Sequence, residues 1–153
     1  MAASLIEDSI EIDASPEKVW SVISDLRRMG EWSPQCKKMF VFGGDVKLGT
    51  QTLNINRRGA MVWPTRSKVV SFEPNRELAF RIAENRTVWT FTIAPTESGV
   101  RLTESRTAVG GQTTKVSSTL VDKFMGGEKP FEAELAEGIR ETLGKIKRAA
   151  QAA

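Results

Sequence analysis

The chain has 153 residues, of which 40% are hydrophobic and 27% are charged, and we expect one globular domain that spans residues 1–153. Its net charge of +3 comes from scattered lysines and arginines without a nucleic-acid-binding motif, so we expect no nucleic-acid partner. It contains neither histidine nor tyrosine, which excludes Ser-His-Asp and Cys-His catalytic sites and any zinc site that needs imidazole, and we expect neither a metal nor a cofactor.

The N-terminal part predicts one strand followed by two short helices. Residues Leu5 to Ile12 alternate between polar and apolar side chains, which is typical of a strand. Ser15 then suits the N-cap of a helix, and Pro16 suits its first position. A second helical piece begins at Asp25 and ends near Gly30. The buried side of the first helix would consist of Val19, Trp20 and Ile23.

The middle of the chain predicts an antiparallel meander. From Cys36 to Val109 the apolar side chains recur at every second position, and tight turns separate the apolar stretches. Consecutive strands joined by short turns pair as neighbours, so we expect a sheet of about seven strands, including the first one. Pro64 indicates a sheet edge or a bulge within its strand. The expected strands of the meander cover residues 37–42, 50–57, 61–72, 77–83, 87–94 and 100–109.

Charged residues continue the apolar faces of two of these strands. Arg57 shares the face of Leu53 and Ile55, and Glu104 and Arg106 extend the apolar face of the last strand. A buried charge without a partner is costly. Two interpretations therefore stay open: either the last strand leaves the core before Glu104, or Glu104 and Arg106 line a cavity. Inside a cavity they would meet a polar ligand group or pair with Arg57 or Arg66 of neighbouring strands.

The C-terminal part predicts a long amphipathic helix over residues 130–150. Its apolar residues recur at spacings of four and three, and its length is about 30 Å. Such a helix needs a surface to cover, and a twisted sheet would curl around it, which gives an α+β fold. Residues 114–125, between two glycine pairs, predict a short helix that serves as a lid or as a packed connector. The apolar stripe of the long helix consists of Phe131, Leu135, Ile139, Leu143 and Ile146.

Five stretches carry a resemblance that covers essentially the whole chain. They are Ala14–Trp20 and Glu31–Pro34 near the start, Phe72–Phe80 and Trp89–Pro95 in the middle, and Gly99–Glu104 before the last helix. Together they resemble the SRPBCC or START-like superfamily, and most of all its polyketide cyclase/dehydrase and lipid-transport group. The resemblance implies the helix-grip fold, with a deep cavity between a curved sheet and a long C-terminal helix. Such cavities hold apolar or aromatic small molecules such as lipids, polyketides and quinones.

This cavity would be lined by the strand faces and the helix stripe. Aromatic side chains suit a small-molecule site, which is mostly apolar with a few polar groups. A carboxylate beside an arginine in an apolar cavity can act as an acid or a base on an enolisable ketone, so the candidate catalytic residues are Glu104, Arg106 and Arg57. The expected ligand-binding residues are Arg57, Trp63, Phe80, Trp89, Phe91, Glu104, Arg106, Phe124, Phe131, Leu135 and Ile139.

The leading functional interpretation is the binding of a hydrophobic or aromatic small molecule, by a carrier or a sensor. One alternative is an enzyme of the polyketide cyclase or dehydratase type. A second is a protein-interaction module related to the activator of the heat-shock-protein-90 ATPase, which would have a filled core and an exposed apolar patch. The chain has no apolar run of about 18 residues and no signal-peptide pattern. We therefore expect a cytoplasmic protein without stable membrane insertion. Because strand edges can pair between chains, both a monomer and a homodimer stay open.

Overall fold

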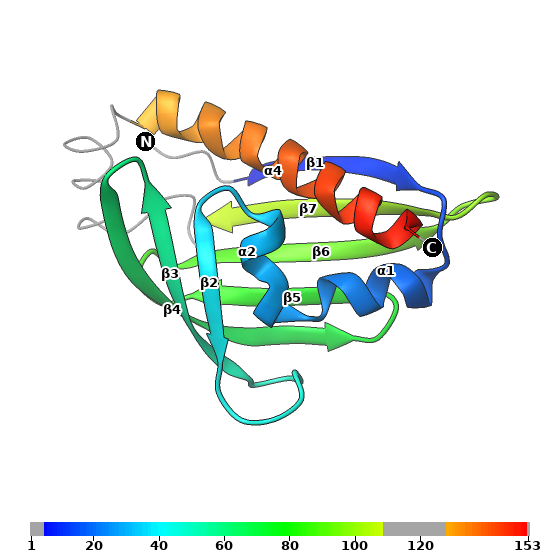
Figure 1. The fold of residues 1–153 in the computed structure, drawn as a ribbon, viewed down its shortest axis with the longest axis horizontal. Helices are drawn as coiled ribbons and strands as arrows, with labels where there is room; N and C mark the ends of the chain where they lie inside the picture. Colours follow the sequence, from blue (N-terminus) through cyan, green and yellow to red (C-terminus); the bar gives the residue numbers. More distant parts are fainter. Residues whose placement is uncertain (1–4, 109–127, 153) are drawn as a thin grey trace.

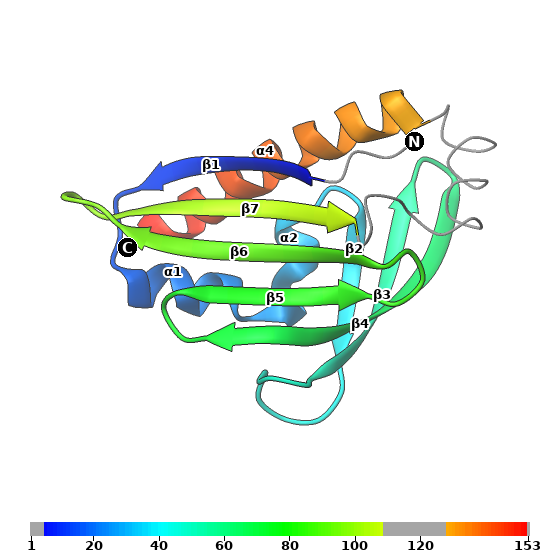
Figure 2. The ribbon, with the colours of Figure 1, turned by 180° about the vertical axis from the view of Figure 1, so that it is seen from behind.

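The computed structural model describes residues 5–108 and 128–152, with side chains from residue 133 onward in the last helix. One curved sheet carries all the helices on one face, as the two opposite views show (Figures 1 and 2). The elements follow the predicted order. They are β1 (Leu5–Ile12), α1 (Pro16–Ile23), the 3-10 helix η1 (Leu26–Arg28), α2 (Met29–Trp32), β2 (Cys36–Val41), β3 (Gln51–Arg58), β4 (Met61–Glu73), β5 (Glu77–Ile82), β6 (Thr87–Pro95), β7 (Val100–Ala108) and α4 (Glu128–Gln151).

The sheet is the predicted antiparallel meander. Its seven strands have the order β1-β7-β6-β5-β4-β3-β2, so that every strand from β2 to β6 lies beside the next one along the chain. The first strand joins the far edge, where Leu5 lies opposite Thr107 and Ile12 opposite Val100. The predicted fold class, a curved antiparallel sheet around a C-terminal helix, is therefore confirmed.

The start of α1 forms as its sequence predicts. Ser15 is the N-cap, and its Oγ accepts a hydrogen bond of 3.1 Å from the backbone N–H of Lys18. Pro16 occupies the first turn, where its missing N–H leaves no partner unsatisfied. The helix buries Val19, Val22 and Ile23 against the sheet side of the molecule.

The apolar stripe of α4 closes the core. Ile139, Leu143 and Ile146 are at most 2% exposed, whereas Leu135 is only half-buried. The hydroxyl of Thr142 donates a 3.2 Å hydrogen bond to the carbonyl of Trp32, which ties α4 to the end of α2. In the parts of the chain that the structure describes, no helix is long and apolar enough to cross a membrane. The segment expected to form a lid or a connector, residues 114–125, lies outside the described residues.

Pro64 lies where its strand has a free side. Ala83 donates from its backbone N to the carbonyl of Arg66, so even-numbered residues in this part of β4 direct their backbone groups toward β5. Pro64 shares this orientation. Pairing between β4 and β5, however, ends at Ser67 and Ile82, before Pro64 is reached. The missing N–H of the proline therefore costs no ladder hydrogen bond, in agreement with the predicted edge position.

The interior face of β3 is the opposite of the predicted one. Thr52 and Asn54 are 1% and 2% exposed, whereas Leu53 and Ile55 are only half-buried. Leu53 lies on the outer face, opposite Phe40 of β2. The inversion is possible because the interior polar groups of β3 and β4 hydrogen-bond to one another, so their burial leaves few of them unsatisfied.

Candidate functional site

A cavity of about 910 Å³ lies between the sheet and the first half of α4. Its floor comes from β4, β5 and β6, its roof from α4, and one side from α2 and β2. Aromatic and aliphatic side chains dominate the wall. They are Trp63, Phe80, Ile82, Trp89, Leu135, Ile139, Met29 and Met39.

The mouth of the cavity carries charged residues, and Arg57 is one of them. Arg57 is exposed, and its Nε donates a 2.8 Å hydrogen bond to the carbonyl of Gly59 at the turn between β3 and β4. Lys37 and Glu137 lie at the same margin and are also exposed. Arg57 therefore belongs to the rim, because the interior face of β3 carries the other set of side chains.

Glu104 is a carboxyl group inside the cavity wall. It lies on β7 opposite Phe91 of β6, is 5% exposed, and lines the cavity. Its Oε1 has no hydrogen-bond partner among the residues that the structure describes. Loss of solvation raises the pKa of Glu104 from its ordinary 4.5 to about 8. The group is therefore mainly a neutral acid at neutral pH, and a neutral acid can donate a hydrogen bond.

Arg106 extends the same wall. It is 3% exposed, lies opposite Trp89 in the register of β6 and β7, and lines the cavity beside Glu104. The interior face of β7 thus runs from Val100 to Ala108 without leaving the core. Of the two interpretations left open by the sequence, the structure supports the cavity wall over the exposed strand end.

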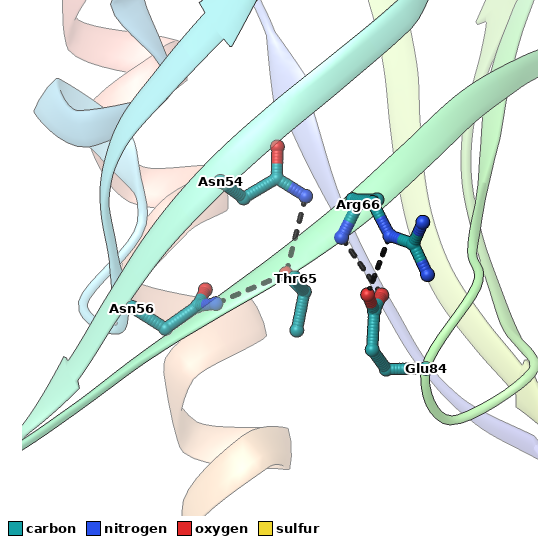
Figure 3. Close-up of polar contacts among 5 residues, drawn as sticks. All are labelled: Asn54, Asn56, Thr65, Arg66 and Glu84. Carbon is teal, nitrogen blue, oxygen red and sulfur yellow. Dashed lines mark hydrogen bonds and ion pairs between the residues drawn. The ribbon is translucent and has the colours of Figure 1, made fainter.

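Among the residues that the structure describes, Glu104 forms no ion pair with Arg57 or Arg66, the arginines considered as its partners. The neighbours of β7 are β1 and β6, so neither Arg57 on β3 nor Arg66 on β4 belongs to an adjacent strand. Arg66 points outward instead, and its Nε forms an ion pair of 2.9 Å with Glu84 (Figure 3).

A polar wall faces the cavity from β3 and β4. Asn54, Asn56 and Thr65 line the cavity, and both asparagine amides donate to the Thr65 hydroxyl, at 3.2 and 3.0 Å (Figure 3). Deeper in the wall, Thr52 hydrogen-bonds to Asn54 at 2.7 Å and to Ser67. These five side chains are called the polar wall below.

Sequence reasoning missed the polar wall. On β3 the polar and apolar residues alternate equally well, so the pattern does not say which set turns inward. A usable signal lies in the hairpin as a whole. In the register of β3 and β4, Thr52 faces Ser67 and Asn54 faces Thr65, so two matched polar pairs occupy one face. Matched polar pairs can satisfy each other when they are buried.

The remaining predicted site residues fall into three groups. Trp63, Phe80 and Trp89 lie in the floor of the cavity, and Leu135 and Ile139 lie in its roof. Phe91 is corrected: it is 1% exposed, belongs to the hydrophobic core and is not among the residues that line the cavity. Phe124 and the side chain of Phe131 lie outside the described residues.

Comparisons with known proteins agree with this geometry. The family described as "Polyketide cyclase / dehydrase and lipid transport" matches residues 5–151. The solution structure of the Polyketide_cyc-like protein Cgl2372 from Corynebacterium glutamicum is 31% identical, with a TM-score of 0.65, and the match covers 95% of this chain and 90% of that one. The comparison with curated proteins gave no match.

Two further solved structures share the fold at lower identity. The KanY protein is 19% identical, with a TM-score of 0.73, over 99% of this chain and all of that one. The di-domain ARO/CYC protein StfQ from the steffimycin biosynthetic pathway is 14% identical, with a TM-score of 0.75, over 97% of this chain. The match covers 50% of StfQ, so this chain spans half of that di-domain protein.

Proposed function

Because this chain belongs to the polyketide cyclase / dehydrase and lipid transport family, we propose that it binds a hydrophobic or aromatic small molecule between its sheet and α4, as a carrier or a sensor. The observation that carries the proposal is the cavity of about 910 Å³. Ligand sites commonly range from about 300 to 1,000 Å³ and combine an apolar lining with a few polar groups. The aromatic floor, Glu104 and the polar wall fit that description.

The position of the tryptophans gives a direct test of binding. Trp63 and Trp89 line the cavity, whereas Trp20 packs edge-on against Phe72, with ring centroids 5.2 Å apart, away from the cavity lining. A bound aromatic molecule should quench the fluorescence of the first two tryptophans. Titration with a panel of lipids, quinones and polyphenols should therefore lose part of its signal in Trp63→Phe or Trp89→Phe and most of it in the double variant, and should keep it in the control Trp20→Phe.

Native mass spectrometry of the freshly purified protein complements the titration. A small molecule that leaves only on denaturation would support the carrier, and its mass would identify the ligand class. If the whole panel fails to quench wild-type fluorescence and no bound molecule is seen, the binding proposal is wrong. A filled core, as the interaction-module alternative requires, is at odds with the cavity.

An enzyme of the cyclase type is the second candidate, and Glu104 with Arg106 favours it. A neutral carboxylic acid can give its proton to a ketone oxygen while a water molecule removes the α-proton, and a guanidinium nearby can stabilise the negative charge that develops on the oxygen. Both side chains line one wall. The test is the exchange of the α-hydrogens of a cyclic ketone with deuterated water, followed by NMR. Catalysis predicts acceleration by the wild type. Glu104→Gln should lose that acceleration and retain binding, because its amide can donate a hydrogen bond but cannot transfer a proton.

A further inference from the structure

Three hydrogen bonds of the polar wall form a chain that runs in one direction, from Ser67 through Thr52 and Asn54 to Thr65. Thr52 has a single hydroxyl proton and donates it to Asn54 Oδ1 at 2.7 Å. In the contact between Thr52 and Ser67, the donor must therefore be Ser67. Asn54 Nδ2 then donates to Thr65 Oγ1 at 3.2 Å. Each donor in such a chain polarises the next, and the chain ends at Thr65.

The hydroxyl of Thr65 is left with one unused donor. Its oxygen accepts hydrogen bonds from both Asn54 and Asn56, which occupies its two lone pairs. Its own proton finds no acceptor among the described residues. Thr65 is 8% exposed and lines the cavity. A buried donor without a partner costs free energy, so this proton favours an acceptor that enters the cavity.

Asn56 provides an unused acceptor next to this donor. Its amide nitrogen donates to the carbonyl of Trp63 at 3.2 Å and to Thr65 at 3.0 Å, so both amide hydrogens are committed. Its Oδ1 has no donor among the described residues. A carbonyl or carboxylate can only accept, and an ammonium can only donate, whereas a hydroxyl group does both. A hydroxyl therefore matches the adjacent Thr65 donor and Asn56 acceptor.

The two polar ends of the cavity are separated by an apolar floor. Glu104 lies on β7 and Thr65 on β4, three strand positions apart, which corresponds to about 14 Å across the strands, and Thr65 lies further along the strand direction, beyond the Ser67–Ile82 pair. Phe80 and Trp89 lie between them on β5 and β6. We propose that the ligand has an apolar body that covers this floor and a hydroxyl group, alcoholic or phenolic, that binds between Thr65 and Asn56. This inference rests on the proposed binding function and adds its polar specificity.

Three bicyclic probes with one skeleton test the inference: tetralin without oxygen, tetralone with a ketone, and tetralol with a hydroxyl. We expect wild-type protein to bind tetralol about three- to tenfold more tightly than tetralin, the size of one or two net hydrogen bonds. Tetralone should lie between them because it accepts from Thr65 but cannot donate to Asn56. Dissociation constants are measured from tryptophan fluorescence.

Variants of both residues separate the donor from the acceptor. Thr65→Val should lower the affinity for tetralone to that for tetralin and should remove one of the two hydrogen bonds of tetralol, and Thr65→Ser should restore both affinities. Asn56→Ala should lower tetralol affinity to that of tetralone and leave tetralone unchanged. Since Thr65→Val also leaves two asparagine amides without their acceptor, tetralin affinity and thermal unfolding report whether that variant is folded. If it is not, Asn56→Ala alone decides the matter.

The outcomes separate this inference from the proposed function. If wild-type protein binds the three probes equally, the cavity binds apolar molecules and the hydroxyl inference is wrong. The same holds if Glu104→Gln, and not the Thr65 or Asn56 variants, abolishes the preference for tetralol. If none of the probes binds, the binding function fails, and the hydroxyl inference fails with it.

Discussion

Arg58 at the end of β3 and Glu134 near the start of α4 form an ion pair of 2.8 Å across the mouth of the cavity. Both carboxylate oxygens of Glu134 accept from the arginine Nε, at 3.0 and 2.8 Å. The two side chains are 33% and 42% exposed, so solvent screens the pair. Its contribution to stability is therefore small, but it connects the two elements between which a ligand would pass.

We predict that Glu134→Gln speeds ligand release severalfold and changes the free energy of unfolding by less than about 1 kcal/mol. Release rates follow from stopped-flow fluorescence with a cavity ligand. Glu11→Gln is the matched control, because Glu11 forms an exposed ion pair of 2.7 Å with Arg101 and does not line the cavity. Equal release rates in both variants and the wild type would show that the pair at the mouth does not restrict exchange.

Glu104 should make the protein less stable as pH rises toward 8. Burial raises the pKa of folded Glu104 to about 8, while the unfolded chain releases this proton near 4.5. Between these values the folded state binds more protons than the unfolded state. The free energy of unfolding should therefore fall with rising pH across this window, by at most about 1.4 kcal/mol per pH unit.

Urea unfolding at several pH values from about 5 to 9 measures this slope. Glu104→Gln keeps the shape of the neutral acid and removes its titration, so the negative slope in this window should shrink. Glu97→Gln, in the exposed turn between β6 and β7, should keep the wild-type profile. Identical profiles for wild type and Glu104→Gln would mean that Glu104 titrates as an exposed carboxyl group.

Local chemistry explains why much of the fold was predictable. Ser15 and Pro16 determine the start of α1 through their own side chains, and alternation determines the strands without reference to distant residues. The stripe of α4 is equally local: Ile139, Leu143 and Ile146 share one helix face whatever lies opposite.

The site was less predictable because it depends on contacts between strands. Asn54 can be buried because Thr65 lies opposite it on β4, and the sequence of β3 alone does not predict which residue will lie opposite. Alternation correctly put Glu104 on the face of Leu102. It could not show how far along β7 this face stays buried beneath α4 or lines the cavity. Phe91 and Trp89 share a face of β6, yet only Trp89 reaches the cavity.

Phe91 and Phe80 should therefore respond differently to truncation. Phe91 is 1% exposed in the core, so Phe91→Ala should lower the free energy of unfolding by about 3–5 kcal/mol and leave ligand affinity nearly unchanged in the folded fraction. Phe80 lines the cavity, so Phe80→Ala should weaken ligand binding and cost less stability, because its ring already borders open space. Urea unfolding and tetralin titration of both variants distinguish the two roles. Equal loss of tetralin affinity in both would place Phe91 in the ligand site after all.

The rate at which the Cys36 thiol is alkylated should report on the cavity. Burial raises the pKa of its thiol from 9.0 to about 11, and its Sγ lies 3.6 Å from the carbonyl of Lys38. A rise of this size leaves about one hundredth of the ordinary thiolate at neutral pH. An alkylating reagent should therefore react about a hundredfold more slowly with the folded chain than with the urea-unfolded chain.

Cys36 also lines the cavity, so a bound ligand should slow the reaction further. Because the chain has one cysteine, mass spectrometry follows the modification directly. Rapid alkylation of folded protein at neutral pH would contradict the buried thiol, and a rate unaffected by saturating ligand would place the ligand away from β2.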